Sequence, residues 1–444
     1  MLPSTYDRLL ADYKELRKQK REIENKKIKD RTEEEQKELE EIREKLYANE
    51  INRNESLMSF FEDLEKKIYD RNFNIDFSKK RGKGDKDIYV INKDDPASYF
   101  AVKCIQRNIY QTFKVKQSSR HTIMTQLKLL LNENLPKYII RTDISSFFES
   151  IPQKELNEKI ENNTLLNIKS KSFIKAILKR YNALSELDKG VPRGISISSY
   201  LSELYMKDID NIIRKREEVL YYVRYVDDIF IILTSLAGKE DIEKYYLDLY
   251  NLFEAHYLKL KLANEDKGKC KLFSYTNSCS ATIDYLGYTL SIQVEKEGFK
   301  TTFEIKNDKL EKYNRRINLA FERFNQTNKY NLRQAKRDLF DSLKFLSGNF
   351  SMTGGKSKIK YGIFYSNDLL DNEACLERLN KCMRAKKILL DDSVFESDES
   401  KKRCEERINK RIQKIDFYKN WVNKKMYSFK EERLKNIKKW LEKE

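Results

Sequence analysis

Two adjacent aspartates interrupt an apolar run in the middle of the chain. Residues 222–234 are rich in Val, Ile, Tyr and Phe, and Asp227 and Asp228 are their only acidic residues. Apolar residues on both sides predict a β-hairpin packed on a core, with the acidic pair at its tip. Adjacent carboxylates resist ionising together unless a cation lies between them, which favours a divalent metal site. The alternative is a plain hairpin turn with Asp-Asp in the bend.

A third aspartate follows another apolar run. Residues 138–148 are typical of a strand that leads into Asp143 and then into small and aromatic residues. Two metal ions about 3.5 to 4 Å apart, bridged by carboxylates from separate strands, are the usual means of in-line phosphoryl transfer. Two strands that end in this way match the palm of a nucleic-acid polymerase. Taken alone, Asp143 is equally compatible with a helix cap or a turn.

The order of five short motifs between residues 138 and 290 resembles that of the reverse transcriptases. Asp143 with Phe148 resembles the first palm motif, and residues 225–228 (Tyr-Val-Asp-Asp) resemble the third. The remaining blocks are the second motif at 190–194, the fourth at 260–267, and the primer grip with Leu286 and Gly287 at its centre. The resemblance implies an α+β fold: a right-hand polymerase with fingers, a palm of antiparallel sheet plus helices, and a helical thumb.

The resemblance also implies the metal ligands and the cofactor. Asp143, Asp227 and Asp228, together with the main chain of Ile144, would hold two Mg²⁺ ions, for which Mn²⁺ can substitute. One ion would activate the primer 3′-hydroxyl, and the other would neutralise charge on the leaving pyrophosphate.

Two further motifs would shape the nucleotide site. Phe148 would stand against the sugar C2′ and exclude ribonucleotides, whereas the alternative is a core position of the kind expected for its neighbour Phe147. Pro192, Arg193 and Gly194 would pack beneath the incoming nucleotide and the template, because glycine permits close approach of the backbone. Arg193 stands where many reverse transcriptases have glutamine.

Basic residues complete the expected substrate contacts. Arg107, Lys116 and Arg120 lie in the predicted fingers, where they would grip the triphosphate and the template backbone. Lys267 would protonate the leaving pyrophosphate, and its alternative is a solvated lysine in a chain with 36% charged residues.

Composition favours a polynucleotide partner. The formal net charge is +18, and residues 301–444 contribute 35 Lys and Arg against 22 Asp and Glu, a net charge of +13. A positive electrostatic field of this size attracts phosphate backbones and predicts salt-dependent binding.

The composition also argues against a structural zinc site and a membrane protein. Six cysteines without C-x-x-C pairing and only two histidines speak against a structural zinc site. No apolar run of 18 residues and no signal peptide are present, so we expect a cytoplasmic protein without membrane contact.

The pattern along the chain predicts five segments. Residues 1–55 form an N-terminal helical extension in which a capping box at Thr32 and Glu35 divides two helices. The extension is either a solvated helical hairpin or an element for oligomerisation or RNA binding. The segments that follow are fingers at 56–137, palm at 138–304, thumb at 305–390, and an acidic linker with a basic C-terminal helical tail at 391–444.

The resemblance is strongest to bacterial defence-associated reverse transcriptases, of the unknown-group and abortive-infection type related to retron and group II intron enzymes. It implies an RNA-directed DNA polymerase that uses dNTPs and a structured noncoding RNA template, forms an RNA/DNA duplex and acts in antiviral defence. Untemplated or protein-primed synthesis in abortive infection and a mobile-element or retron enzyme are the alternatives, and a catalytically silent RNA-binding scaffold is a third. A homo-oligomer stays open.

Overall fold

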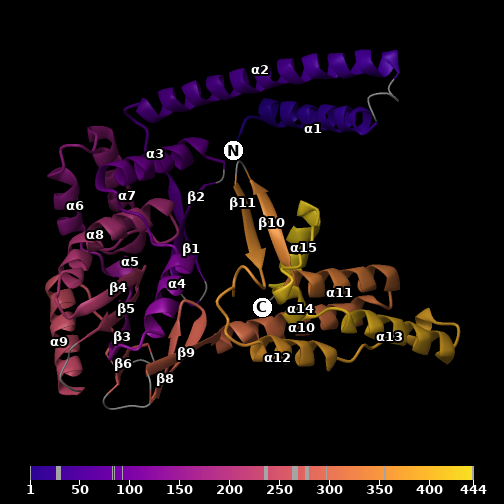
Figure 1. Ribbon diagram of the computed structural model, residues 1–444. Coiled ribbons are helices and arrows are strands. Elements are labelled where there is room, and N and C mark those ends of the chain that lie inside the picture. Colours follow the sequence, from indigo (N-terminus) through magenta and orange to yellow (C-terminus); the bar gives the residue numbers. More distant parts are fainter. Residues whose placement is uncertain are drawn as a thin grey trace.

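The computed structural model describes most of the 444 residues. The described ranges are 2–26, 32–82, 84, 86–92, 94–234, 239–262, 269–275, 280–296, 298–354 and 357–442. Figure 1 shows the region of the predicted fingers and palm on the left, a C-terminal lobe of helices on the right and a helical hairpin across the top.

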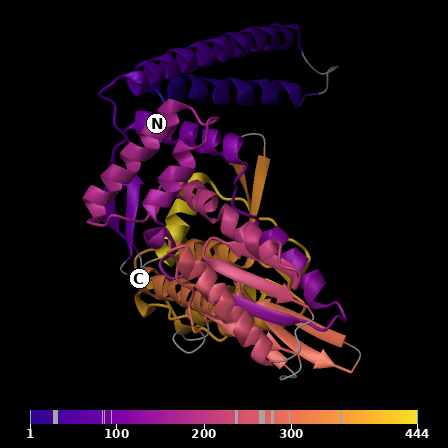
Figure 2. The same ribbon diagram turned by 90° about the vertical axis from the view of Figure 1, so that its left-hand side faces the viewer.

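The N-terminal hairpin consists of α1 (Ser4–Glu24) and α2 (Glu33–Tyr69). The predicted capping box is confirmed, because the Thr32 side chain accepts from the Glu35 N–H while the Glu35 side chain accepts from the Thr32 N–H. A small apolar cluster joins the two helices, and Figure 2 shows the pair standing above the rest of the molecule. The predicted boundary at residue 55 falls inside α2, because nothing in its charged surface interrupts helical propensity there.

The region of the predicted fingers continues from α2 into a two-stranded sheet and two helices. These elements are β1 (Phe77–Arg81), β2 (Asp87–Ile91), α3 (Pro96–Phe113) and α4 (Arg120–Leu131). Helix α3 packs between α2 and the palm helices.

The palm is built on an antiparallel four-stranded sheet in the order β4-β5-β3-β6. Its elements are β3 (Tyr138–Asp143), α5 (Phe147–Ser150), α6 (Gln153–Glu161), α7 (Ile168–Ser185), α8 (Ser196–Arg214), β4 (Val219–Tyr225), β5 (Asp228–Leu233), α9 (Lys239–Ala255) and β6 (Lys271–Ser274). Helix α8 follows the Gly190–Gly194 turn directly, and its apolar face is buried. A three-stranded antiparallel sheet follows, formed by β7 (Ser280–Tyr285), β8 (Tyr288–Glu295) and β9 (Gly298–Ile305).

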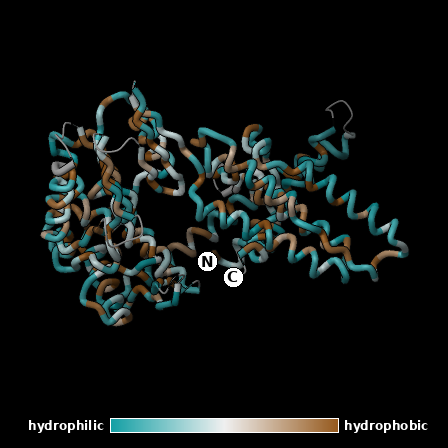
Figure 3. Tube along the Cα trace, turned by 90° about the horizontal axis from the view of Figure 1, so that it is seen from below, coloured by the Kyte–Doolittle hydropathy of each residue, from teal (hydrophilic) through white to brown (hydrophobic). Residues whose placement is uncertain are grey.

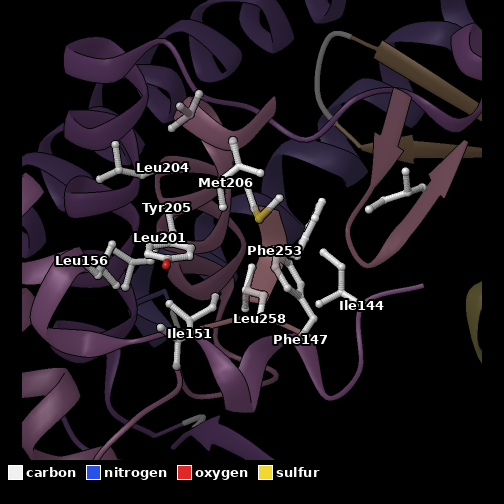
Figure 4. Close-up of a cluster of buried hydrophobic side chains, with 14 of the residues drawn as sticks. Ile144, Phe147, Ile151, Leu156, Leu201, Leu204, Tyr205, Met206, Phe253 and Leu258 are labelled. Carbon is white, nitrogen blue, oxygen red and sulfur yellow. The ribbon is translucent and has the colours of Figure 1, made fainter. Parts of the chain in front are cut away.

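Both faces of the four-stranded sheet are buried, which fixes its register. Along β5, Ile229, Ile231 and Leu233 enter one core, whereas Phe230 and Ile232 enter another. The first core contains α6, α8 and α9, and Figure 4 shows its side chains from these helices and from the segment after β3. Because side chains alternate between the two faces of a sheet, a shift of β5 by one residue would move each of its side chains into the opposite core. This fixed register determines which residues meet at the strand ends.

The second core joins the sheet to the C-terminal lobe. The lobe contains α10 (Asn307–Thr327), α11 (Leu332–Ser347), β10 (Asn349–Gly354), β11 (Ser357–Gly362), α12 (Ala374–Arg384), a 3₁₀ turn (Asp392–Val394), α13 (Asp398–Gln413), α14 (Phe417–Val422) and α15 (Glu431–Leu441). Figure 3 shows apolar segments inside each of two lobes and hydrophilic residues along the outward helices.

The segment predicted as an appended basic tail is part of this lobe. Ile408, Ile412, Phe417, Ile437 and Leu441 are buried in the second core, and α14 and α15 contact α10, α11 and α12. Residues 401–444 are highly charged, but apolar residues lie along one narrow face of their helices. This face is enough to pack a charged helix on a core. The predicted basic C-terminal segment is therefore helical, and its helices pack on the second core.

The mixed α+β fold with antiparallel sheets and a polymerase-like palm is confirmed. None of the helices in the described ranges combines the length and the apolar character needed to cross a bilayer.

Candidate active site

The three aspartates meet at one end of the four-stranded sheet. Asp143 and Asp228 are direct partners on β3 and β5, and Asp227 lies in the two-residue turn between β4 and β5. One carboxylate oxygen from each residue lies within 4.8 Å of the others. The predicted hairpin is thus confirmed, and the fold brings together carboxylates that are 84 residues apart in the chain (143 to 227).

Burial and mutual repulsion disfavour the charged forms of Asp143 and Asp228. Burial raises the pKa of Asp228 to about 6, and the charges of Asp143 and Asp227 act in the same direction. Burial also raises the pKa of Asp143, with Asp227 as the next cause. The surrounding protein therefore does not fully offset the cost of charging these two carboxyls.

Two cations of the protein lie against the triad. The Arg141 Nη2 atom donates to Asp228 Oδ1 at 2.5 Å, and Nη1 donates to the Lys269 carbonyl. The Lys269 ammonium lies 3.7 Å from Asp143 Oδ2. Our sequence reasoning missed both roles, although Arg141 stands two residues before Asp143 in a strand and so shares its side of the sheet. A basic residue inside a buried apolar strand was the available signal.

Ile144, the predicted main-chain ligand, directly follows Asp143. Its N–H donates to the Asp227 carbonyl at 3.0 Å, and its side chain is buried in the first core. The main chain of Ile144 therefore lies beside the triad, as a ligand role requires.

Phe147 and Phe148 differ in environment. Phe147 is buried at 1% exposure, whereas Phe148 is half-buried at the edge of the first core. The Arg193 guanidinium lies 5.1 Å from the centre of the Phe148 ring and donates to both oxygens of Glu149, at 2.8 and 3.0 Å. These hydrogen bonds raise the pKa of Arg193, with a further contribution from the charge of Asp227. Glu149 is a third residue whose role the sequence did not predict.

The glycines that flank Pro192 make close contacts within the protein. Gly190 has φ +92°, and a Cβ there would lie 2.9 Å from the main chain of Glu149. Gly194 has φ +102°, and its Cβ would lie 2.8 Å from the Tyr89 carbonyl oxygen. The Tyr89 N–H donates to the Arg193 carbonyl at 2.7 Å. Both glycines are thus required by the packing of the turn on α5 and β2, a reason that we did not predict.

Arg120 lies against the predicted primer grip. Leu286 and Gly287 form the tight turn between β7 and β8, with φ of +43° and +82°. The Arg120 Nε atom donates to the Leu286 carbonyl at 2.6 Å, and Nη1 donates to the Ser366 carbonyl at 3.4 Å. The nearby Tyr285 hydroxyl donates to the Asp228 carbonyl at 3.4 Å. Arg120 therefore supports the β7–β8 turn. Its Nη2 atom is buried, and its predicted phosphate contact stays a prediction.

The other predicted basic contacts are less defined by the structure. Arg107 on α3 and Lys116 after it are exposed, and no hydrogen bond or ion pair in the described part of the chain joins them to the triad. Lys267 lies outside the described residues. Their contacts with substrate stay predictions.

Comparisons with known proteins agree with the geometry. Residues 97–290 match the family model described as reverse transcriptase (RNA-dependent DNA polymerase). No curated protein matches the chain. This region is therefore a reverse transcriptase domain, which is the domain of RNA-directed DNA polymerases, a class of nucleotidyltransferases. The match leaves more than half of the 444 residues outside the family model.

Solved structures show only a distant likeness. Telomerase from Candida albicans, in complex with the TWJ fragment of telomeric RNA, is 12% identical with a TM-score of 0.36, over 83% of this chain and 64% of that one. Apo telomerase from Candida Tropicalis is 14% identical with a TM-score of 0.38, over 84% and 61%. The RNA polymerase complex inside a dsRNA virus is 9% identical with a TM-score of 0.35, over 67% and 30%. At these scores the likeness carries no argument about activity.

The residues of the triad fit a divalent cation. They offer hard carboxylate oxygens within 4.8 Å of one another, and the raised pKa values of Asp143 and Asp228 indicate that Arg141 and Lys269 do not fully offset the cost of burying these charges. Asp143, Asp227 and Asp228 could therefore hold a metal ion.

Proposed function

We propose that this protein is a reverse transcriptase that synthesises DNA from dNTPs on an RNA template, with Mg²⁺ held by Asp143, Asp227 and Asp228. The observation that carries the proposal is the convergence of these carboxylates within 4.8 Å at the strand ends of a reverse transcriptase domain. Bound Mg²⁺, in two sites and replaceable by Mn²⁺, would neutralise the triphosphate and make the primer 3′-hydroxyl more acidic.

The protein's own residues would prepare the site around the metal ligands. Arg141 orients the Asp228 carboxylate through its hydrogen bond. Phe148, whose position Arg193 and Glu149 support, would exclude a 2′-hydroxyl by steric contact. The turn at Leu286 and Gly287, held by Arg120, would support the primer end.

The basic surface supports a nucleic-acid partner. Residues 301–444 carry a net charge of +13, and a field of this sign draws polyanions by release of their counterions. We propose that the template is a cognate structured noncoding RNA and that the enzyme acts in the cytoplasm in phage defence, on the resemblance of its motifs to defence-associated reverse transcriptases. Sequencing the nucleic acids that copurify with the protein tests this part, because a single structured RNA and its DNA copy are the expected result.

Primer extension tests the central proposal. The purified protein, given an RNA template, a DNA primer and dNTPs, should add nucleotides with Mg²⁺ and lose activity with a chelator. Asp227→Asn and Asp228→Asn should each lower the rate by at least about 100-fold, which corresponds to about 2.7 kcal/mol of barrier. Asp208→Asn is the matched control, because Asp208 is an exposed carboxylate paired with Lys159. Retained activity in both triad variants would refute the assignment of the metal ligands.

A further inference from the structure

The turn that carries Asp227 has a strained backbone. Val226, between β4 and β5, has φ +61°, which lies in the left-handed region. A β-branched side chain is a true outlier there, because its Cβ substituents crowd the backbone. Such a conformation persists only when neighbouring groups impose it.

The Arg224 guanidinium holds Val226 in this conformation. The side chain of Arg224 is only 2% exposed, and its Nη1 atom donates to the Val226 carbonyl at 2.9 Å. The rest of the guanidinium faces two carboxylates of helix α8: Nε and Nη2 donate to Asp210 at 3.0 and 2.8 Å, and Nη1 and Nη2 donate to Glu203 at 3.0 and 2.8 Å. All five N–H donors of the fork are thus engaged.

The same contacts clamp the main chain of Asp227 from both sides. Arg224 holds the carbonyl that precedes Asp227, and the Ile144 N–H holds the carbonyl of Asp227 itself at 3.0 Å. Two fixed carbonyls fix the two peptide planes that flank the residue. The direction of the Asp227 side chain therefore depends on α8 through Arg224 and on the end of β3 through Ile144.

We propose that Arg224 is a positioning residue that holds the strained turn so that the Asp227 carboxylate stays within ligand distance of Asp143 and Asp228. The inference rests on the proposed function of the triad. Lysine cannot replace arginine in this role, because a single ammonium cannot bond two carboxylates and a carbonyl in the planar geometry of the fork. Lysine does keep the positive charge that Glu203 and Asp210 require, so Arg224→Lys separates the geometry from the charge.

The test compares Arg224→Lys with Arg433→Lys. Arg433 matches Arg224 in pattern, since it is largely buried and donates to Asp338 at 2.7 Å and Asp341 at 2.9 Å, but it lies in the C-terminal lobe. In primer extension we expect Arg224→Lys to lower kcat at least about 10-fold and to raise the half-saturating Mg²⁺ concentration several-fold. The affinity for primer–template should stay within about 2-fold. Arg433→Lys should leave the Mg²⁺ dependence unchanged.

A double substitution isolates the strain. Val226→Gly removes the steric penalty of a positive φ, so the turn should depend less on Arg224. The variant with both Arg224→Lys and Val226→Gly should recover part of the Mg²⁺ affinity lost in Arg224→Lys. If Arg224→Lys fails to fold, Glu203→Gln replaces it. This substitution weakens the hydrogen bonds between Arg224 and residue 203 while Asp210 and Val226 keep their contacts. A smaller increase in the half-saturating Mg²⁺ concentration is then expected.

Binding of Mn²⁺, followed by electron paramagnetic resonance, gives a readout that does not require activity. Weaker Mn²⁺ binding in Arg224→Lys than in Arg433→Lys supports the inference. Equal Mn²⁺ binding and equal Mg²⁺ dependence in the two variants would overturn it. An inactive wild-type protein that still binds Mn²⁺ through the triad would instead count against the proposed function alone.

Discussion

Asp228→Asn should stabilise the metal-free protein at neutral pH, although it removes a proposed metal ligand. Burial and the neighbouring aspartates raise the pKa of Asp228 from 3.8 to about 6, and this net shift already includes the attraction of Arg141. A folded-state pKa above the unfolded value means that the folded protein binds the proton more tightly. The charged form therefore costs folding free energy once the pH exceeds the unfolded pKa.

The free-energy cost of charging Asp228 in the folded protein follows from the size of its pKa shift. Each pKa unit corresponds to about 1.36 kcal/mol, so a shift of about two units gives a penalty of about 3 kcal/mol above pH 7. The penalty is absent below about pH 4 and falls to about half near pH 5, where the folded carboxyl is mostly protonated. The neutral asparagine removes the penalty, and its oxygen can still accept from Arg141.

Urea denaturation in a chelator at pH 8 and pH 5 measures the effect. We expect Asp228→Asn to gain up to about 3 kcal/mol at pH 8 and about half as much at pH 5. Added Mg²⁺ should stabilise the wild type more than the variant, because a ligand of the folded state adds stability in proportion to its binding. Asp210→Asn is the control of opposite sign, since it leaves the buried Arg224 short of a partner and should cost about 3 kcal/mol. A loss of stability in metal-free Asp228→Asn at pH 8 would refute the reasoning.

Three further outcomes are expected. Phe148→Ala should relax discrimination against ribonucleotides by at least about 10-fold in single-nucleotide incorporation, because a removed ring no longer meets the 2′-hydroxyl; unchanged sugar selectivity would place the gate at another residue. Gly194→Ala should lower the free energy of unfolding by about 1 to 3 kcal/mol, because φ is +102° and the Cβ would lie 2.8 Å from the Tyr89 carbonyl. Chemical denaturation measures this loss. The control is Gly84→Ala, because Gly84 also has a positive φ but no atom lies within 4 Å of its Cβ position. Ile412→Ala on α13 should lower the free energy of unfolding by about 2 to 4 kcal/mol, because Ile412 is 3% exposed. Leu389→Ala should have little effect, because Leu389 is 63% exposed. Equal effects of the two substitutions in thermal unfolding would contradict the packing of α13 on the second core.

The strands beside Asp143 and Asp227 could be predicted because their signals are local. The apolar runs around Asp143 and Asp227 have the period and composition of buried strands, and acidic residues at the end of such runs are costly unless something uses them. The capping box at Thr32 was equally predictable, because it depends on residues within one helical turn. The packing of the C-terminal helices on the second core was not predicted, since it depends on contacts with helices far away in the chain.

The strands that carry the three aspartates, and the order of the motifs, could be recognised from local patterns, because hydrophobic periodicity and turn chemistry act over a few residues. Three contacts became known from the folded chain alone: Arg141 pairs with Asp228, Lys269 approaches Asp143, and α8 holds the Val226 turn through Arg224. These contacts join segments far apart in the chain, and they exist because the register of a sheet buried on both faces places β3, β4 and β5 side by side.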